Sequence, residues 1–200
     1  KARNALAHLL WESGDVEGAR AEFEATRRRN PGNLRAAIGA RLLLPQVYAG
    51  AGHLEESRER YRAGLDALAA EVGLFASSPP QEVLSDARWT NFYLAYQGRD
   101  DRELQGRYGD FLHRVVAAAA PRLVGPRPRR KRSGGRLRVG FLSHFFFDCT
   151  AGRYFESWVS GLDPARFERF VYYTNAHAAD FTRRLAASAD HFRHLPGRPI

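Results

Sequence analysis

The residue types best suited to chemistry gather in one short stretch, residues 143–153, with the sequence SHFFFDCTAGR. A carboxylate, a thiol and a hydroxyl follow one another at Asp148, Cys149 and Thr150, and Gly152 and Arg153 come next. Glycine permits close approach of the backbone, and arginine pairs with anions. The N–H groups at the start of a helix favour phosphate or carboxylate. This pattern predicts an anion-binding turn at a helix N-terminus.

The same residues have a simpler interpretation, in which the side chain of Asp148 or Thr150 only caps the helix that follows. Spacing alone leaves both interpretations open. His144 lies earlier in the stretch, and we assign it no role. The downstream histidines are His177, His191 and His194. They lack a carboxylate or thiol at metal-ligand spacing, so the sequence predicts no metal site.

The elements around this stretch read as strand, loop, helix, strand. Leu137–Leu142 is a short run rich in β-formers, Gly152–Leu162 is a predicted helix, and Phe167–Tyr173 is a second apolar run. A crossover of this length fits a parallel pair of strands. A further helix is expected at Ala179–Ser188, with a short strand at Phe192–Leu195. Ligands of open parallel sheets bind outside the carboxyl ends of the strands, where the loop 143–151 is expected to lie.

The upstream half has helical periodicity. Asn4–Arg29 predicts a helical hairpin that turns at Gly14-Asp15, and Asn33–Leu68 predicts a second one. Small and aromatic residues fall where a tetratricopeptide repeat has them. Pro45 is expected to bend the first helix of the second hairpin. Two more helices are predicted, at Glu82–Tyr96 and Asp101–Ala120.

Composition changes suggest four parts. Residues 1–74 are predicted to form tetratricopeptide-like repeats, 75–125 a helical connector, 126–136 a basic linker and 137–200 the first part of a Rossmann-like domain. The linker, PRPRRKRSGGR, holds Pro, Gly and basic residues but no apolar group. We interpret it as a hinge; a nucleic-acid tract is the alternative. Two repeats are fewer than a repeat domain needs to be stable by itself, and the predicted sheet has fewer strands and helices than a complete doubly wound domain. The sequence is therefore expected to be a fragment.

Two stretches carry a family resemblance. The first is residues 137–173, LRVGFLSHFFFDCTAGRYFESWVSGLDPARFERFVYY. It resembles the opening of the catalytic region of the O-GlcNAc transferase and SPINDLY-like glycosyltransferases, which form glycosyltransferase family 41. The second is residues 90–111, TNFYLAYQGRDDRELQGRYGDF, which resembles the segment that joins the repeats to the catalytic region in bacterial members. The resemblance implies an α + α/β architecture, with tetratricopeptide-like hairpins followed by the first part of a parallel sheet domain of the GT-B type.

The resemblance also implies roles for individual residues. Cys149 stands where the family has a loop histidine associated with the catalytic centre, and a thiol does not replace imidazole proton chemistry without a shifted pKa. Asp148 is the second catalytic candidate, and Thr150, Gly152 and Arg153 are expected to bind the donor.

The implied reaction transfers N-acetylglucosamine, or another hexose, from a nucleotide sugar to protein Ser or Thr hydroxyls. The donor is expected to be UDP-GlcNAc, with no separate cofactor, and the repeats would hold the acceptor polypeptide in a groove. The 200 residues alone are expected to be inactive. The alternative is a repeat-based protein-binding scaffold with an inactive catalytic remnant.

Charge and composition narrow the class of protein. The net charge is +9 and there is one cysteine, which excludes an internal disulfide and suits a cytoplasmic protein. No apolar run approaches the roughly 18 residues of a membrane helix, so no membrane partner is expected. The positive net charge has two interpretations, a basic surface exposed to solvent or a surface that binds an anionic partner. A nucleotide suits the second interpretation, and we do not expect a nucleic-acid partner.

Overall fold

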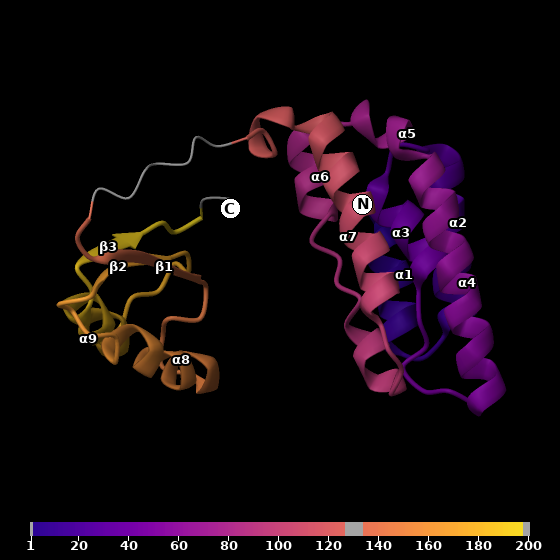
Figure 1. Ribbon diagram of the computed structural model, residues 1–200. Helices are drawn as coiled ribbons and strands as arrows, with labels where there is room; N and C mark the ends of the chain where they lie inside the picture. The colour runs from indigo at the N-terminus through magenta and orange to yellow at the C-terminus, as the bar shows by residue number, and fades with distance from the viewer. Residues whose placement is uncertain (1, 127–133, 198–200) are drawn as a thin grey trace. The chain divides into compact units, whose positions relative to one another are not determined.

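The computed structural model describes residues 2–126 and 134–197, which belong to two compact units, Lys1–Arg127 and Pro128–Ile200. The first unit is helical, and the second combines helices with a small sheet (Figure 1). Most of the predicted basic linker, residues 127–133, lies outside the described residues. No helix within the described ranges combines the length and apolar composition that crossing a bilayer requires.

The first predicted hairpin is confirmed. It consists of α1 (Ala2–Glu12) and α2 (Val16–Arg29). Gly14 turns the chain with a φ of 91°, a conformation that favours glycine. The Asp15 side chain then accepts a hydrogen bond from Gly18 N–H at 2.8 Å and caps α2. The ring of Phe23 is buried against Gly39 of the next hairpin, where a β-carbon would collide with it.

The second hairpin consists of α3 (Leu34–Leu42) and α4 (Ala51–Ala70). The bend predicted at Pro45 is wrong, because α3 has already ended and the chain from 43 to 50 is not helical. Proline lacks an N–H group and disfavours helical backbone at the residue before it. The extended segment is still part of the core: Leu43 and Leu44 are buried, and Trp11 Nε1 donates to the Leu44 carbonyl at 2.7 Å.

Shorter elements follow. They are α5 (Val72–Ala76), α6 (Pro80–Asp86), the 3-10 turn η1 (Phe92–Gln97), α7 (Arg102–Ala119) and the 3-10 turn η2 (Pro121–Leu123). The boundary predicted at 74/75 falls inside α5. The single helix predicted at Glu82–Tyr96 is wrong, since α6 ends at Asp86 and only a 3-10 turn follows. Tertiary contacts explain the break, because Asp86 accepts from Arg35 N–H at 3.2 Å and Trp89 packs on Trp11 and Phe23.

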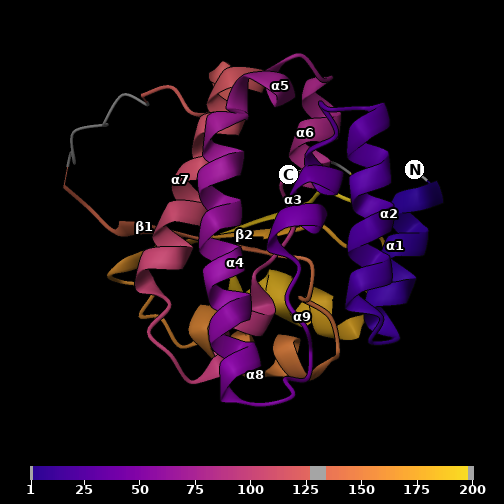
Figure 2. The same cartoon turned by 90° about the vertical axis from the view of Figure 1, so that its right-hand side faces the viewer.

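A buried arginine joins α4 to the start of α7, and Figure 2 shows these two helices side by side. The Arg58 side chain is only 8% exposed. Its guanidinium donates to Gln97 Oε1 at 2.5 Å, to Asp101 Oδ1 at 2.7 Å and to the Asp100 carbonyl at 3.0 Å. A buried charge requires such partners, so this network fixes the segment before α7 on α4.

The second unit contains a three-stranded parallel sheet in the order β1 (Leu137–Ser143), β2 (Phe167–Tyr173), β3 (His191–His194). The register places Phe141, Val171 and Phe192 side by side. The crossover helices α8 (Thr150–Ser160) and α9 (Asp180–Ser188) lie on the same face of the sheet (Figure 1). The predicted βαβ unit with a parallel pair is therefore confirmed, as is a third short strand.

The amino ends of the strands are joined by one carboxylate. Asp190 accepts from the backbone N–H of Arg169 at 2.9 Å and from the side chains of Arg136 and Arg169 at 2.6 and 3.0 Å. These bonds, led by the backbone one, hold the pKa of Asp190 far below its ordinary range. The hydrogen bonds of Asp190 thus hold the strands together at their amino ends, whereas the loops that follow the strands lie at the carboxyl ends.

We expect Arg58→Ala to lower the free energy of unfolding of the helical unit by about 3 kcal/mol, because it leaves Asp101 and Gln97 without their buried partner. The measurement is urea denaturation followed by helical circular dichroism. The matched control is Arg62→Ala, which removes an exposed pair with Glu59 on the same helix and should cost less than about 0.5 kcal/mol. Equal losses in the two variants would contradict the role given to Arg58.

Candidate functional site

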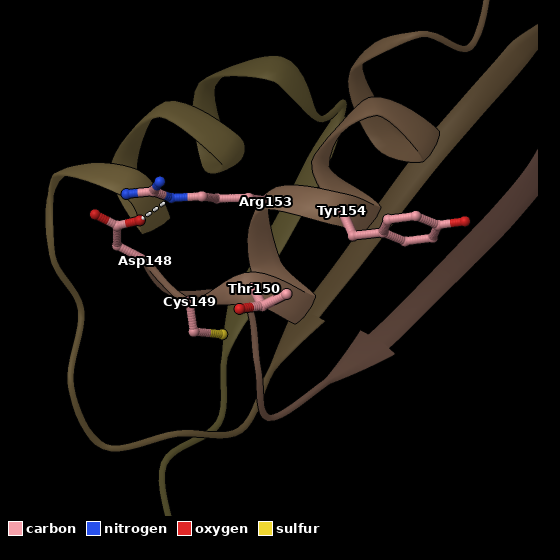
Figure 3. A pocket seen from close by; sticks show the side chains of 5 residues that line it. All are labelled: Asp148, Cys149, Thr150, Arg153 and Tyr154. Atoms are coloured by element: carbon pink, nitrogen blue, oxygen red, sulfur yellow. Dashed lines mark hydrogen bonds and ion pairs between the residues drawn. The ribbon is translucent and has the colours of Figure 1, made fainter.

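The predicted site lies at the carboxyl end of β1, where the loop 144–149 enters α8. An open hollow of about 660 Å³ is lined there by Asp148, Cys149, Thr150, Arg153 and Tyr154 (Figure 3). Four of these five were proposed from the sequence. The fifth predicted residue, Gly152, lies in the first turn of α8 beneath the loop. The structure thus brings the predicted residues together, while their roles stay predictions.

The loop rests directly on the first turn of α8. A β-carbon at Gly152 would collide with the carbonyl oxygen of Phe147 and lie 2.8 Å from that of Phe145. Gly152 is buried, and the close approach that it permits is to the chain's own loop. Two loop carbonyls occupy the space that a β-carbon would need, and the donor-binding role of Gly152 stays a prediction.

The cap of α8 is the thiol of Cys149. Its Sγ accepts a hydrogen bond from Gly152 N–H at 3.4 Å and donates to the Phe145 carbonyl at 3.6 Å. The alternative interpretation of the sequence named Asp148 or Thr150 as the capping residue, and neither side chain caps α8. The extended backbone of Cys149, with a φ of −148° and a ψ of 170°, points its side chain at the helix start, whereas its neighbours face outward.

Asp148 and Arg153 form an ion pair across the turn, with Nε and Oδ1 2.6 Å apart (Figure 3). The hydrogen bond from Arg153 lowers the pKa of Asp148, and the same bond raises the pKa of Arg153. Both side chains are exposed. An anionic ligand that used Arg153 would therefore have to share it with Asp148 or displace that carboxylate.

Tyr154 is the lining residue that the sequence analysis missed. Thr150, Arg153 and Tyr154 have the i, i+3, i+4 spacing that places residues on one face of a helix. That spacing was the signal that could have revealed Tyr154. Its ring is 65% exposed and points away from the Asp148–Arg153 pair in Figure 3. The hollow therefore has a charged side and an aromatic side.

A polar network lies beside the loop at the same edge of the sheet. Asn175, which follows β2, accepts from His177 N–H through Oδ1 at 3.0 Å, so its Nδ2 group is the one that faces His144 Nε2 at 3.1 Å. Because that amide group only donates, His144 Nε2 is the acceptor in this contact. His194 Nε2 donates to the Asn175 carbonyl at 2.7 Å. Asn175 thus joins the ends of all three strands.

These histidines do not make a metal centre. Within the part of the chain that the structure describes, no three His, Cys, Asp or Glu side chains are placed to hold one ion. The hydrogen bonds to Asn175 orient His144 and His194 instead. The sequence analysis gave Asn175 no role, because His144 and His194 lie 31 and 19 residues away from it in the chain.

Comparison with known proteins gives a limited result. No protein-family model matches the chain, and no curated protein matches it. Among solved structures, a mutant O-GlcNAc transferase from Thermobaculum terrenum aligns with 96% of this chain at 18% sequence identity and a TM-score of 0.34. The chain spans 40% of the length of that structure. Similarity at this level carries no argument about function.

We expect Gly152→Ala to lower the free energy of unfolding of the sheet unit by about 1–3 kcal/mol, because the added methyl group must displace the loop carbonyls. Amide hydrogen exchange measures this loss. Alkylation of Cys149 by iodoacetamide should also become faster as its cap opens. Gly140→Ala in β1 is the matched control, since a β-carbon there meets its nearest atom, in the Tyr172 ring, at 3.9 Å. Unchanged exchange and alkylation in Gly152→Ala would rule out the close contact.

Proposed function

We propose that this chain is the repeat region and the start of the catalytic region of a cytoplasmic glycosyltransferase. The enzyme would transfer N-acetylglucosamine, or another hexose, from a nucleotide sugar to Ser or Thr hydroxyls of a protein. The observation that carries the proposal is the hollow at the carboxyl end of β1, where Asp148, Cys149, Thr150 and Arg153 meet. The resemblance of residues 137–173 to the glycosyltransferase family described above supports the same assignment.

The proposed roles follow from the chemistry of the lining groups. The donor, UDP-GlcNAc, brings a diphosphate whose negative charge increases as the sugar leaves. In this proposal the Arg153 guanidinium would stabilise that charge. The Thr150 hydroxyl would add a neutral hydrogen bond. Asp148, the second catalytic candidate, pairs with that guanidinium at 2.6 Å and would have to share it with the diphosphate. The helical unit would bind the acceptor polypeptide.

A second candidate is the protein-binding scaffold with an inactive catalytic remnant. The observation that favours it is the engagement of Cys149, whose Sγ makes two hydrogen bonds inside the turn. A thiol used as a helix cap has a structural role and does not need to take part in proton transfer. In this candidate the helices bind a polypeptide and the hollow binds no nucleotide sugar.

Donor binding can be tested by titrating the chain with UDP-GlcNAc and UDP-glucose and following the amide resonances of residues 148–154. Asp148→Asn should bind about two- to fivefold tighter, because it frees Arg153 from an exposed pair. Arg153→Gln should bind at least about fivefold weaker, since it removes the charged partner of the phosphate.

Asp180→Asn is the matched control for this titration, because Asp180 pairs with the exposed Arg183 on α9 in the same way. It should leave donor affinity unchanged. If neither sugar nucleotide shifts the resonances of residues 148–154, the transferase proposal fails and the scaffold remains.

Substitutions of Cys149 separate a capping role from a chemical one. Serine is a good N-cap, so Cys149→Ser should keep the stability of the sheet unit, whereas Cys149→Ala should lose about 1 kcal/mol. Denaturation of both variants measures this difference. In the full-length protein, loss of sugar transfer in the stable Cys149→Ser variant would show that the thiol takes part in the reaction. Absence of transfer even in the wild type, with polypeptide binding retained, would favour the scaffold.

A further inference from the structure

The outer edge of β1 carries backbone hydrogen-bonding groups that no described strand uses. β1 is the first strand in the order of the sheet, and among the described strands it pairs with β2 alone. On that side Leu137 N–H donates to the Arg166 carbonyl at 2.8 Å, and the Ser143 carbonyl accepts from Thr174 N–H at 3.2 Å. The N–H and C=O groups of one strand residue point to the same side, and that side alternates along the strand. The residues that point these groups to the open edge are therefore Arg138, Gly140 and Leu142.

This edge lacks the features that normally keep strands from pairing. Proteins protect a sheet edge by making the strand short or by placing charged side chains or proline on it. The opposite edge strand, β3, has only four residues, HFRH, whereas β1 has seven, LRVGFLS. The one charged residue of β1, Arg138, lies across the sheet, with its guanidinium 4.5 Å from the centre of the Phe170 ring and 3.4 Å from Glu168. It therefore does not guard the edge.

The helix over β1 exposes aromatic rings on the side of this edge. Asp148 pairs with Arg153, which lowers its pKa most, and Arg184 of α9 lowers that pKa further. The Arg153 side of α8 is therefore the side of α9, which connects β2 to β3. Tyr154 points in the opposite direction (Figure 3), which is the side of the open edge. The rings on this side follow one another with centroids 5.0 Å apart, and they belong to Tyr154, Phe155 and Trp158.

We propose that the open edge of β1 binds the same edge of a second copy of this chain, which joins the two sheets into one. With the two β1 strands antiparallel about a two-fold axis at Gly140, Gly140 lies opposite itself and Arg138 lies opposite Leu142 of the second copy. These are the residues that point outward, and each opposed pair exchanges two backbone hydrogen bonds. An axis perpendicular to the sheet also keeps both copies of α8 on one face, where their aromatic sides meet.

The exposed area supports a second copy as the occupant. Tyr154, Trp158 and Phe155 are 65%, 57% and 41% exposed. These fractions leave roughly 250–400 Å² of ring surface open, since such side chains offer about 150–250 Å² each. A standard interface buries about 800 Å² on each partner, and the rings and the paired edge together approach that area. A single added strand would leave the rings of α8 exposed. The inference does not depend on the proposed function.

Sedimentation velocity of the 200-residue chain at increasing concentration tests the pairing. We expect a monomer–dimer equilibrium with a roughly micromolar dissociation constant, as suits an interface of this size. Amide hydrogen exchange then identifies the edge. The amides of Gly140 and Leu142 should exchange at least about tenfold slower where the dimer dominates than where the monomer does. The amide of Leu137, which already donates toward β2, is the internal control and should change less.

Two substitutions at one position test the register. Leu142→Lys places a lysine opposite Arg138 of the second copy, twice in each dimer, and should weaken dimerisation at least about tenfold, because like charges opposite each other destabilise paired strands. Leu142→Glu places the opposite charge there and should dimerise at least about tenfold more tightly than Leu142→Lys. Val47→Lys, a change at an exposed position of the helical unit, is the matched control and should dimerise as the wild type does.

Trp158→Ser tests the contribution of α8 and should weaken dimerisation at least about fivefold, because each dimer loses the ring twice. A monomer at every concentration, a dimer in which Gly140 and Leu142 exchange as in the monomer, or equal dimerisation of Leu142→Lys and Leu142→Glu would each overturn the inference. The first of these outcomes would leave the edge of β1 to a strand of another polypeptide.

Discussion

The sheet unit depends on one close contact, between the loop that leaves β1 and the first turn of α8. It exists only because residue 152 has no β-carbon, so that the carbonyls of Phe145 and Phe147 can lie against the helix. The contact brings the Cys149 thiol to the helix start as its cap. With the thiol turned inward, Asp148 and Thr150 face solvent. The packing constraint at Gly152 therefore decides which groups line the hollow.

The helical unit shows two ways of treating a buried polar group. Arg58 reaches three acceptors, and the network is complete without any ligand. Asn4 satisfies its donor through Asn33 but leaves its oxygen without a donor in the described chain. A satisfied network stabilises a fold, whereas a buried acceptor without a donor costs free energy. We therefore assign a stabilising role to Arg58.

Several parts of the fold could be predicted because their signals are local. The β-formers of 137–142 and 167–173, separated by a helix-length crossover, predicted a parallel pair, and the register confirms it. The turn at Gly14 and a helix at Asp101–Ala120, observed as Arg102–Ala119, were also predicted from short-range patterns. The residues around Cys149 were predicted to gather because they are neighbours in the chain, and they do.

The amino-acid sequence by itself determined where the main helices and strands form and which loop lies at the carboxyl end of β1. Tertiary structure decided the rest, because the deciding partners are far apart in the chain. Asp86, the last residue of α6, binds Arg35, 51 residues away, and Asn175 contacts His144 across 31 residues. The capping residue of α8 could not be predicted from the sequence either, because the packing of the loop on Gly152 places Cys149, and not Asp148, at the helix start. Periodicity and spacing describe neighbours along the chain, whereas hydrogen bonds and van der Waals contacts act between neighbours in space.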